Sequence, residues 1–312
     1  MKIVDFTSKH VADAYRLATQ EYETAREKTP VLPALALPNL AFYAENGLGV
    51  ALYENEMLLG FLATEMPFQN AFHIPGVTGI FSPLGANGAV SSARDFVYAK
   101  LYEAAAEKWH SHGATSHSIC LYAFDTVAQN KLFQYGFGMR CADAIAPISS
   151  FFSLPKNEAY AFRTLENEEK KAILPLLNAL QSHLEKSPVF MSRPPFCEKE
   201  FMAEQQAHPT RFFVLQEGDA PIAFLEIAEA AETFVSRAPF IANIVGAYLL
   251  PAYRGEGLYP SLLSHVATVL AAEDKTHLGV DFETFNPAAF SFWHKYFSPY
   301  TYSLTRRIDT PF

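Results

Sequence analysis

The feature that most constrains this sequence is a set of short motifs that recur at a nearly constant distance. Such spacing indicates an internal duplication, in which each copy folds as a similar unit. The chain has 312 residues, which is enough for two domains. We therefore expect two similar α/β domains in tandem, residues 1–147 and 148–312. The matching pairs are Lys28-Thr29-Pro30-Val31 with Lys186-Ser187-Pro188-Val189 (158 positions, 186 minus 28), Phe61-Leu62 with Phe224-Leu225 (163 positions, 224 minus 61), and Asp125-Thr126-Val127-Ala128 with Asn286-Pro287-Ala288-Ala289 (161 positions, 286 minus 125).

The first half is predicted to alternate between strands and helices. Short apolar runs indicate strands, and longer segments with apolar residues three and four positions apart indicate helices. The proline-rich segment 29–38 is expected to be a loop. The expected strands are 2–6, 50–53, 57–65, 71–81 and 115–122, and the expected helices start near Ser8 and cover 93–110 and 125–135.

In the second half, the apolar run 240–250 leads through a turn into a helix. Pro251 ends the strand, because proline cannot donate to a sheet ladder, and apolar residues at helical spacing follow from Leu258. Gly255 and Gly257 permit positive φ angles and close approach of a ligand to the backbone. Free N–H groups and the helix dipole favour an anion there, and Arg254 adds a charge suited to phosphate. The pattern predicts a phosphate-binding turn, although an ordinary strand-to-helix turn has the same signature.

This stretch resembles a signature of the GNAT acetyltransferase superfamily, Pro-x-Tyr-Arg-Gly-x-Gly, through residues 251–257. A second motif of that family follows in order, as the Asn-Pro-Ala-Ala segment that starts at Asn286. The resemblance implies two tandem GNAT-like domains, each a mixed, mostly antiparallel central sheet flanked by helices. That class is α/β, or α+β in some schemes. The resemblance also implies acetyl-CoA as cosubstrate, with its pyrophosphate on the glycine-containing turn.

The family pattern implies roles for individual residues in the second domain. The pantetheine arm would pair with the strand end at Tyr248, Leu249 and Leu250, and the Leu249 N–H would polarise the thioester carbonyl. Asn286 would contact the same arm, and it also suits a plain helix cap. Arg254 would face the pyrophosphate. The N–H groups for the pyrophosphate would come from Gly255, Glu256, Gly257, Leu258 and Tyr259.

The general acid of many family members is a tyrosine seven residues after the motif asparagine. Here that position holds Trp293, which has no acidic proton and which we group with the cofactor-binding residues. Tyr296, one helical turn further on, is the substitute candidate for the acid. A positioned acid contributes about 10²–10⁴ in rate, so the tryptophan weakens an enzymatic interpretation without refuting it.

Carboxylates on two expected strands are candidates for the base that deprotonates an amine. Alternation along 280–285 puts Asp281 and Glu283 on one face, and Glu283 is the preferred base. Glu226, on another strand, is expected near the substrate. For Asp281 or Glu283 taken alone, a salt bridge at a strand end is the favoured interpretation. The apolar loop 188–196 contains Arg193, which we expect to bind a carboxylate of the acceptor.

The first domain lacks the features of a cofactor turn. At a shift of 161 positions, Gly255 and Gly257 correspond to Arg94 and Phe96. Side chains at those positions would obstruct the close backbone approach that a pyrophosphate needs. We expect the first domain to be a degenerate copy that binds no CoA productively and serves as scaffold and pocket wall.

Composition narrows the function classes. The net charge of −9 argues against general nucleic-acid binding. The three cysteines have no metal-like spacing, and we expect free thiols in a cytoplasmic protein and no metal. No apolar run reaches membrane-spanning length, and the first residues do not resemble a signal peptide.

We therefore expect an N-acyltransferase that moves acetyl from acetyl-CoA to a small-molecule amine by direct attack, as a monomer or homodimer. Three alternatives remain open from the sequence. They are a non-catalytic acyl-CoA-binding scaffold, an enzyme similar to mycothiol synthase, and a protein-modifying acetyltransferase. A cleft plugged by Trp293 and Tyr296 would favour the scaffold.

Overall fold

The computed structural model describes residues 1–155, 157 and 159–308, and contacts divide the chain into two compact units. The first unit contains residues 1–143 and the C-terminal residues from 299 onward, and the second contains residues 144–298. The last strand of the chain therefore belongs with the first unit. The boundary between 147 and 148 stays a prediction about the duplication, because the units are defined by contacts. No described helix is long and apolar enough to cross a membrane.

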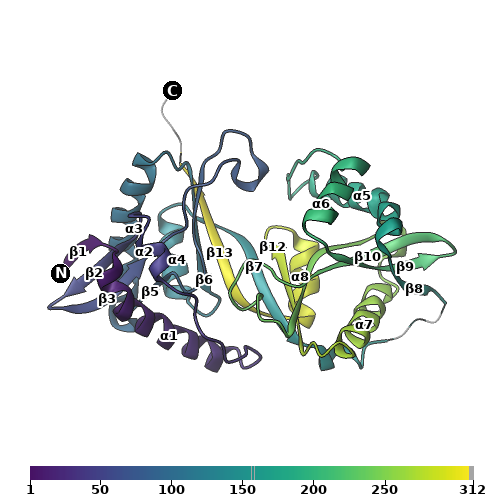
Figure 1. The fold of residues 1–312 in the computed structure, drawn as a ribbon, viewed down its shortest axis with the longest axis horizontal. Coiled ribbons are helices and arrows are strands. Elements are labelled where there is room, and N and C mark those ends of the chain that lie inside the picture. The colour runs from purple at the N-terminus through teal and green to yellow at the C-terminus, as the bar shows by residue number, and fades with distance from the viewer. Residues whose placement is uncertain (156, 158, 309–312) are drawn as a thin grey trace. The chain divides into compact units, whose positions relative to one another are not determined.

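The first unit places two long helices against short strands (Figure 1). Its strands β7 and β13 each cross the boundary between the units at one end. The elements are β1 (Lys2–Asp5), the 3-10 helix η1 (Ser8–His10), α1 (Val11–Lys28), α2 (Ala41–Ala44), β2 (Val50–Glu54), β3 (Met57–Leu62), η2 (Ala71–His73), β4 (Gly79–Ser82), β5 (Asn87–Ala89), η3 (Ser91–Ala93), α3 (Arg94–Ser111), β6 (Ser116–Tyr122), α4 (Thr126–Gln134), β7 (Gly138–Pro147) and β13 (Ser298–Arg307).

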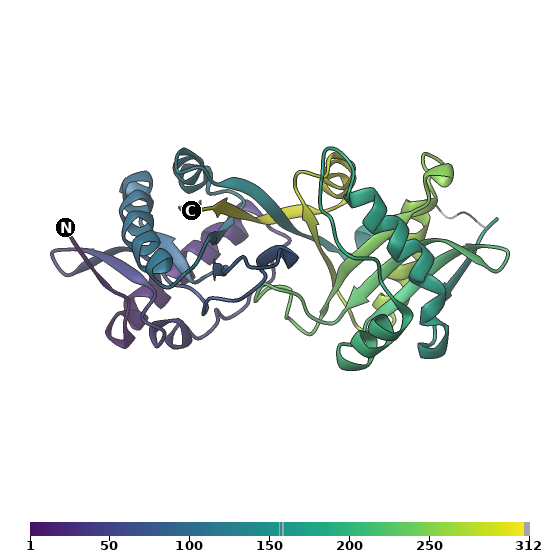
Figure 2. The same cartoon turned by 90° about the horizontal axis from the view of Figure 1, so that it is seen from above.

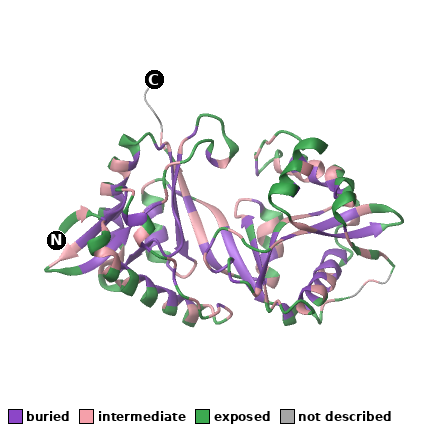
Figure 3. Cartoon of the chain, viewed as in Figure 1, coloured by how far each residue is buried: buried purple, intermediate pink, exposed green. Residues whose placement is uncertain are grey.

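The second unit is a sheet with helices on both faces. Helices α5 and α6 lie on one side of its strands and α7 on the other (Figures 1 and 2). Most strand residues are buried, and the exposed residues gather on the outer turns of the helices and on loops (Figure 3). The elements are η4 (Ile148–Phe151), β8 (Ala161–Thr164), η5 (Asn167–Ile173), α5 (Leu174–Leu184), α6 (Glu198–Ala207), β9 (Arg211–Glu217), β10 (Ala220–Ala228), β11 (Ile241–Leu249), η6 (Pro251–Tyr253), α7 (Leu258–Ala271), β12 (His277–Glu283) and α8 (Pro287–Tyr296).

The two parts of the chain repeat the same order of elements. A strand, two helices, two paired strands, a third strand, a long helix, a strand, a short helix and a last strand occur in each, and the first part has one additional short strand, β5, before its long helix. Strand β12 begins 161 positions after β6 (277 minus 116), and α8 begins 161 positions after α4 (287 minus 126). The expected mixed α/β architecture is confirmed, with mostly antiparallel pairing around one parallel pair in each unit.

One strand expected from the sequence is mostly absent. The segment 71–81 begins with the 3-10 helix η2, and the strand β4 starts only at Gly79. Asn70, Phe72 and His73 have φ angles of 57°, 56° and 60°, which lie in the left-handed region and interrupt an extended chain. The apolar content of the segment suggested a strand, but its backbone conformation does not support one.

Strands β11 and β12 run parallel for a short distance and then separate. Their pairing covers only Ile241–Ile244 against His277–Val280, although both strands continue further. On its other edge β11 stays paired with β10 up to Leu249, and a bulge occurs where Glu226 pairs with Gly246 and the next residue of β10 pairs with Ile244. A bulge bends its strand and changes its direction. The second half of β11 therefore has one paired edge and one open edge.

Three helices of the first unit, α1, α3 and α4, are joined by a buried ionic cluster. Arg94, at the start of α3, contacts Glu21 of α1 at 2.6 Å and Asp125, the cap of α4, at 2.6 Å. Glu21 also accepts a hydrogen bond from the Ala89 N–H at 2.9 Å. All three charged side chains are at least about nine-tenths buried, with exposures of 12%, 8% and 2% for Arg94, Glu21 and Asp125.

Buried charges are tolerated when each is paired, and the loss of one partner leaves the others uncompensated. We predict that Arg94→Met destabilises the first unit by about 3–5 kcal/mol. Arg16→Met, which removes an exposed pair with Asp13 on α1, should change stability by less than about 1 kcal/mol.

The chain has two tryptophans, and both are buried. In a Trp293→Phe background, the fluorescence of Trp109 reports urea unfolding of the first unit alone. Equal midpoint shifts for Arg94→Met and Arg16→Met would contradict a structural role for the cluster.

Candidate functional site

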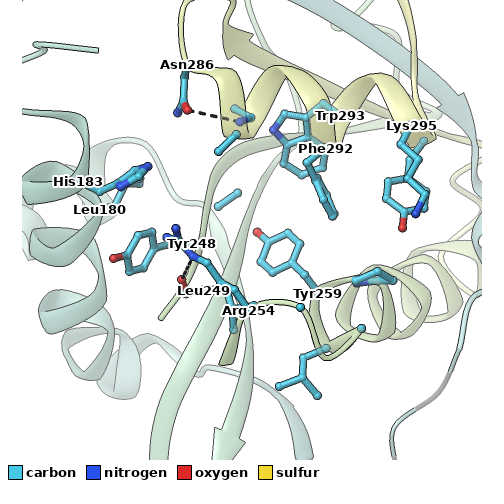
Figure 4. Close-up of a pocket in the computed structure, with 18 residues that line it drawn as sticks. Leu180, His183, Tyr248, Leu249, Arg254, Tyr259, Asn286, Phe292, Trp293 and Lys295 are labelled. Carbon is cyan, nitrogen blue, oxygen red and sulfur yellow. Dashed lines mark hydrogen bonds between the residues drawn. The ribbon is translucent and has the colours of Figure 1, made fainter. Parts of the chain in front are cut away.

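The second unit contains a cavity of about 480 Å³ between four of its elements, α5, β11, α7 and α8. Figure 4 shows side chains from these elements facing a common space, which lies at the end of β11 where it has left β12. The lining residues are Leu180, His183, Ala247, Tyr248, Leu249, Arg254, Gly255, Gly257, Leu258, Tyr259, Pro260, Asn286, Ala288, Ala289, Phe292, Trp293, Lys295 and Tyr296.

The glycine turn, residues 254–257, forms one wall of this cavity and leads into α7. Gly255 and Gly257 have φ angles of 89° and 74°, a region that side chains rarely adopt. No heavy atom beyond the neighbouring residues lies within 4 Å of a Cβ built at either glycine. The turn therefore presents bare backbone to open space beside the first N–H groups of a 14-residue helix. That arrangement suits an anion such as a phosphate.

The open edge of β11 forms a second wall. The Leu250 N–H donates to the Ile222 carbonyl of β10 at 3.0 Å. Because backbone groups alternate in direction along an antiparallel strand, the N–H and C=O of Leu249 point the other way, toward the side that β12 has left. The Leu249 carbonyl accepts a hydrogen bond there from Nε of Arg254 at 3.1 Å, drawn in Figure 4. By the same alternation, the Ala247 N–H also faces this edge.

Arg254 and Tyr248 bring charge and an aromatic surface to the strand end. The guanidinium carbon of Arg254 lies 5.5 Å from the Tyr248 ring centroid, within range of a cation–π contact. The Tyr248 ring is 6.2 Å from the His183 ring of α5. Tyr248 also packs in the core with Phe224. The Arg254 side chain is exposed, but two groups of β11, the Leu249 carbonyl and the Tyr248 ring, hold its guanidinium at the edge of the cavity.

Helix α8 closes the cavity with an aromatic cluster. Trp293 is 5% exposed and packs against Phe292 and Phe297, with ring centroids 5.0 and 5.4 Å away. Tyr259 lies 6.3 Å from the same ring and donates from its hydroxyl to the Phe224 carbonyl at 2.9 Å. The tryptophan therefore belongs to the wall and leaves the cavity open. Tyr296 lines the cavity on the same helix, 5.1 Å from Phe292 between ring centroids.

Asn286 caps α8 and faces the cavity. Its side-chain oxygen accepts from the Ala289 N–H at 3.4 Å, as expected for an asparagine followed by proline at a helix start. Asp125 does the same for α4 in the first unit, accepting from Ala128 at 3.1 Å. The two helices use the same capping position, 161 residues apart (286 minus 125), with an amide in one and a carboxylate in the other.

The structure brings most of the predicted cofactor residues together and leaves several others outside the cavity lining. The predicted residues that line it are Tyr248, Leu249, Arg254, Gly255, Gly257, Leu258, Tyr259, Asn286, Trp293 and Tyr296. The predicted residues that are not part of the lining are Leu250, Glu256, Glu283, Glu226 and Arg193. The roles assigned to both groups stay predictions.

Glu226 belongs to a polar chain on the α6 side of the sheet. It accepts from the Thr210 hydroxyl at 2.7 Å, Thr210 accepts from Gln205 at 2.8 Å, and Gln205 accepts from the Lys170 ammonium at 3.0 Å. Burial raises the pKa of Glu226, while Thr210 and Lys170 oppose that rise. A Cβ added at Gly246 would lie 2.5 Å from the Glu226 carboxylate, so a larger residue at this position would clash with the carboxylate.

Sequence reasoning missed the contribution of α5. Leu180 and His183 lie three positions apart, which places them on one face of the helix, and both line the cavity. Helical spacing was the available signal. It could not show that this face meets the end of β11, because that contact depends on tertiary packing.

The corresponding region of the first unit is filled by its own side chains. The ionic cluster joins α1, α3 and α4, which are the counterparts of α5, α7 and α8. Arg94 lies 161 positions before Gly255 (255 minus 94) and occupies the region with a neutralised guanidinium. Asn87 adds a buried link, donating to the Cys120 carbonyl at 3.1 Å and accepting from Tyr98 at 2.9 Å. That this copy takes no CoA stays a prediction.

Comparison with known proteins finds a family match within the second unit. The profile of the family described as acetyltransferase (GNAT) matches residues 177–297. No curated protein matches the chain.

Solved structures resemble the whole chain at low sequence identity. A GCN5-related N-acetyltransferase from Sphaerobacter thermophilus has a TM-score of 0.58 at 12% identity, covering 100% of this chain and 96% of its own. A tandem GNAT protein from the clavulanic acid biosynthesis pathway has a TM-score of 0.51 at 12% identity, covering 100% and 99%. A glucosamine N-acetyltransferase region of a fungal multi-domain β-N-acetylglucosaminidase has a TM-score of 0.55 at 12% identity, covering 97% and 38%. At this identity the likeness concerns the fold.

The family match covers the elements that build the cavity, and the fold agrees with tandem members over the full length. Residues 177–297 of this chain therefore match the acetyltransferase (GNAT) family, and the fold of the whole chain is similar to that of tandem GNAT proteins.

Proposed function

We propose that the second unit transfers an acetyl group from acetyl-CoA to the amine of a small molecule. The observation that carries this proposal is the meeting of three features at one cavity. A bare glycine turn, an open strand edge and the capped start of α8 all face the same space.

The residues present fit acetyl-CoA. The glycine turn with Arg254 offers N–H groups and a positive charge to a pyrophosphate. The open edge offers the backbone N–H groups of Ala247 and Leu249 to a pantetheine arm, while the Leu249 carbonyl is bonded to Arg254. The apolar lining from α8 suits the arm's carbon chain.

The proposed chemistry is direct attack of the amine on the thioester carbonyl. The Leu249 N–H stabilises the charge that develops on the carbonyl oxygen. Tyr296, which lines the cavity, is the candidate donor of a proton to the leaving sulfur. Glu283 stays a predicted base, and Glu226 and Arg193 stay predicted substrate contacts.

The scaffold alternative is less favoured by the geometry. It was expected to show a cleft plugged by Trp293 and Tyr296. Trp293 instead packs sideways into the wall, and a cavity of about 480 Å³ remains in front of it.

We predict that the protein acetylates at least one member of a panel of small primary amines, measured by mass spectrometry of the products. If Arg193 binds a carboxylate of the acceptor, Arg193→Ala should lower kcat/KM by about 10-fold or more for amino acids. The same change should leave amines without a carboxylate unaffected. Binding of acetyl-CoA without acetylation of any amine would support the scaffold.

A second prediction concerns Asn286. Asn286→Asp keeps the cap, as Asp125 shows in α4, but places a carboxylate in a lining that otherwise has none among its described residues. The affinity for acetyl-CoA should fall about 10-fold, near 1.4 kcal/mol, because the new charge faces an anionic ligand.

Asn286→Ala is the matched control, since it removes the cap without adding charge and should cost about 1 kcal/mol of stability. Calorimetry and thermal unfolding separate the two effects. An aspartate variant that binds acetyl-CoA as tightly as the parent would remove Asn286 from the cofactor site.

A further inference from the structure

The described lining of the cavity contains no carboxylate that could deprotonate an attacking amine. None of the described lining residues is Asp or Glu. Its ionisable side chains are one histidine, one arginine, one lysine and three tyrosines. Arginine and lysine ordinarily hold their proton at neutral pH, and so does tyrosine, whereas a neutral imidazole accepts one. Histidine is therefore the residue type in this lining suited to remove a proton.

His183 has the geometry for that task. It projects from the last turn of α5 toward the strand end, next to Tyr248 (Figure 4). Among the described residues, no protein group makes a hydrogen bond with either ring nitrogen, so both remain available to a ligand. Leu180, one turn earlier on the same face, lines the cavity beside it with an apolar side chain.

The surroundings of His183 keep its ring neutral. Burial lowers the pKa of His183, and the positive charges of Arg254 and Lys186 lower it further. The other nearby ionisable groups are Tyr248, across from it on β11, and Glu185, whose carboxylate accepts from the Ser192 hydroxyl at 3.3 Å. A histidine with a lowered pKa is unprotonated at neutral pH and ready to accept a proton.

Resting on the proposed function, we infer that His183 is the general base of the reaction. It takes the proton that the amine nitrogen loses as the nitrogen–carbon bond forms. The carbon–sulfur bond breaks with its electron pair moving to sulfur. The thiolate takes a proton from Tyr296, and the proton that His183 took passes through solvent to the tyrosine, so both side chains return to their starting forms. The products are the amide and the CoA thiol.

The same arrangement links the base to the cosubstrate. A pyrophosphate on the glycine turn would offset the charge of Arg254, which is one of the two charges that lower the pKa of His183. Binding of CoA should therefore raise the pKa of His183 and make it a stronger base only when the cavity is loaded. Arg254→Gln should raise the pKa in the absence of CoA for the same reason.

The test uses water as the nucleophile, because no acceptor has to be known. Acetyl-CoA hydrolysis by the full chain is followed through loss of thioester absorbance between about pH 5 and pH 9. The parent should exceed the rate in buffer, and the rate should rise with pH to a plateau as His183 loses its proton. His183→Gln should lower the plateau about 100-fold and remove the rise. Imidazole should partly restore hydrolysis by His183→Ala.

His208→Gln is the matched control, since His208 is exposed at the end of α6 and lies outside the cavity lining. It should behave as the parent. Histidine C–H resonances, assigned by loss of one signal in His183→Gln, give the pKa with and without CoA.

The outcomes separate this inference from the proposed function. If calorimetry shows that the parent does not bind acetyl-CoA, the proposed function fails, and this inference fails with it. If the parent and His183→Gln both bind but hydrolyse at equal rates, or if Glu283→Gln instead removes the pH dependence, only the role of His183 is overturned. No hydrolysis above the buffer rate by a parent that binds would also overturn it.

Discussion

The site depends on the separation of β11 from β12 after four residues of parallel pairing. A parallel pair that continued would satisfy the backbone of β11 on both edges and leave no place for a ligand to pair. The bulge opposite Glu226 bends β11 while β10 holds its other edge, so the open edge is fixed in position. The glycine turn, the start of α8 and the inner face of α5 then converge on that opening.

The first unit has the same order of elements as the second, but side chains fill the place that corresponds to the cavity. In the first unit, Arg94 stands where the second has a glycine, and Glu21 and Asp125 neutralise it. Charges so deeply buried require mutual pairing, so the cluster holds α1, α3 and α4 together. In the first unit the space between these helices holds the ionic cluster, whereas in the second unit the corresponding space is an open cavity.

Local patterns made the glycine turn, the α8 cap and the repeated order of elements predictable from the sequence. Gly255 and Gly257 act through their own backbone, and Asn286 through a bond to a residue three positions away. His183 was not predictable, because its role follows from the packing of α5 on the end of β11. The prediction of a strand at 71–81 was mostly wrong, because the apolar residues there have the composition of a strand but Phe72 and its neighbours adopt positive φ angles. The packing of Trp293 against Phe297 was also not predictable, because sequence spacing does not show which way the indole ring turns.

The measurement that tests the central claim most directly is a calorimetric titration with acetyl-CoA. It compares the parent with a variant in which Gly255 and Gly257 are both valine, since valine disfavours the positive φ angles at these positions. One site per chain in the parent, lost in the variant, is the predicted result. No binding to the parent, or two sites per chain, would contradict the account of one open and one closed copy.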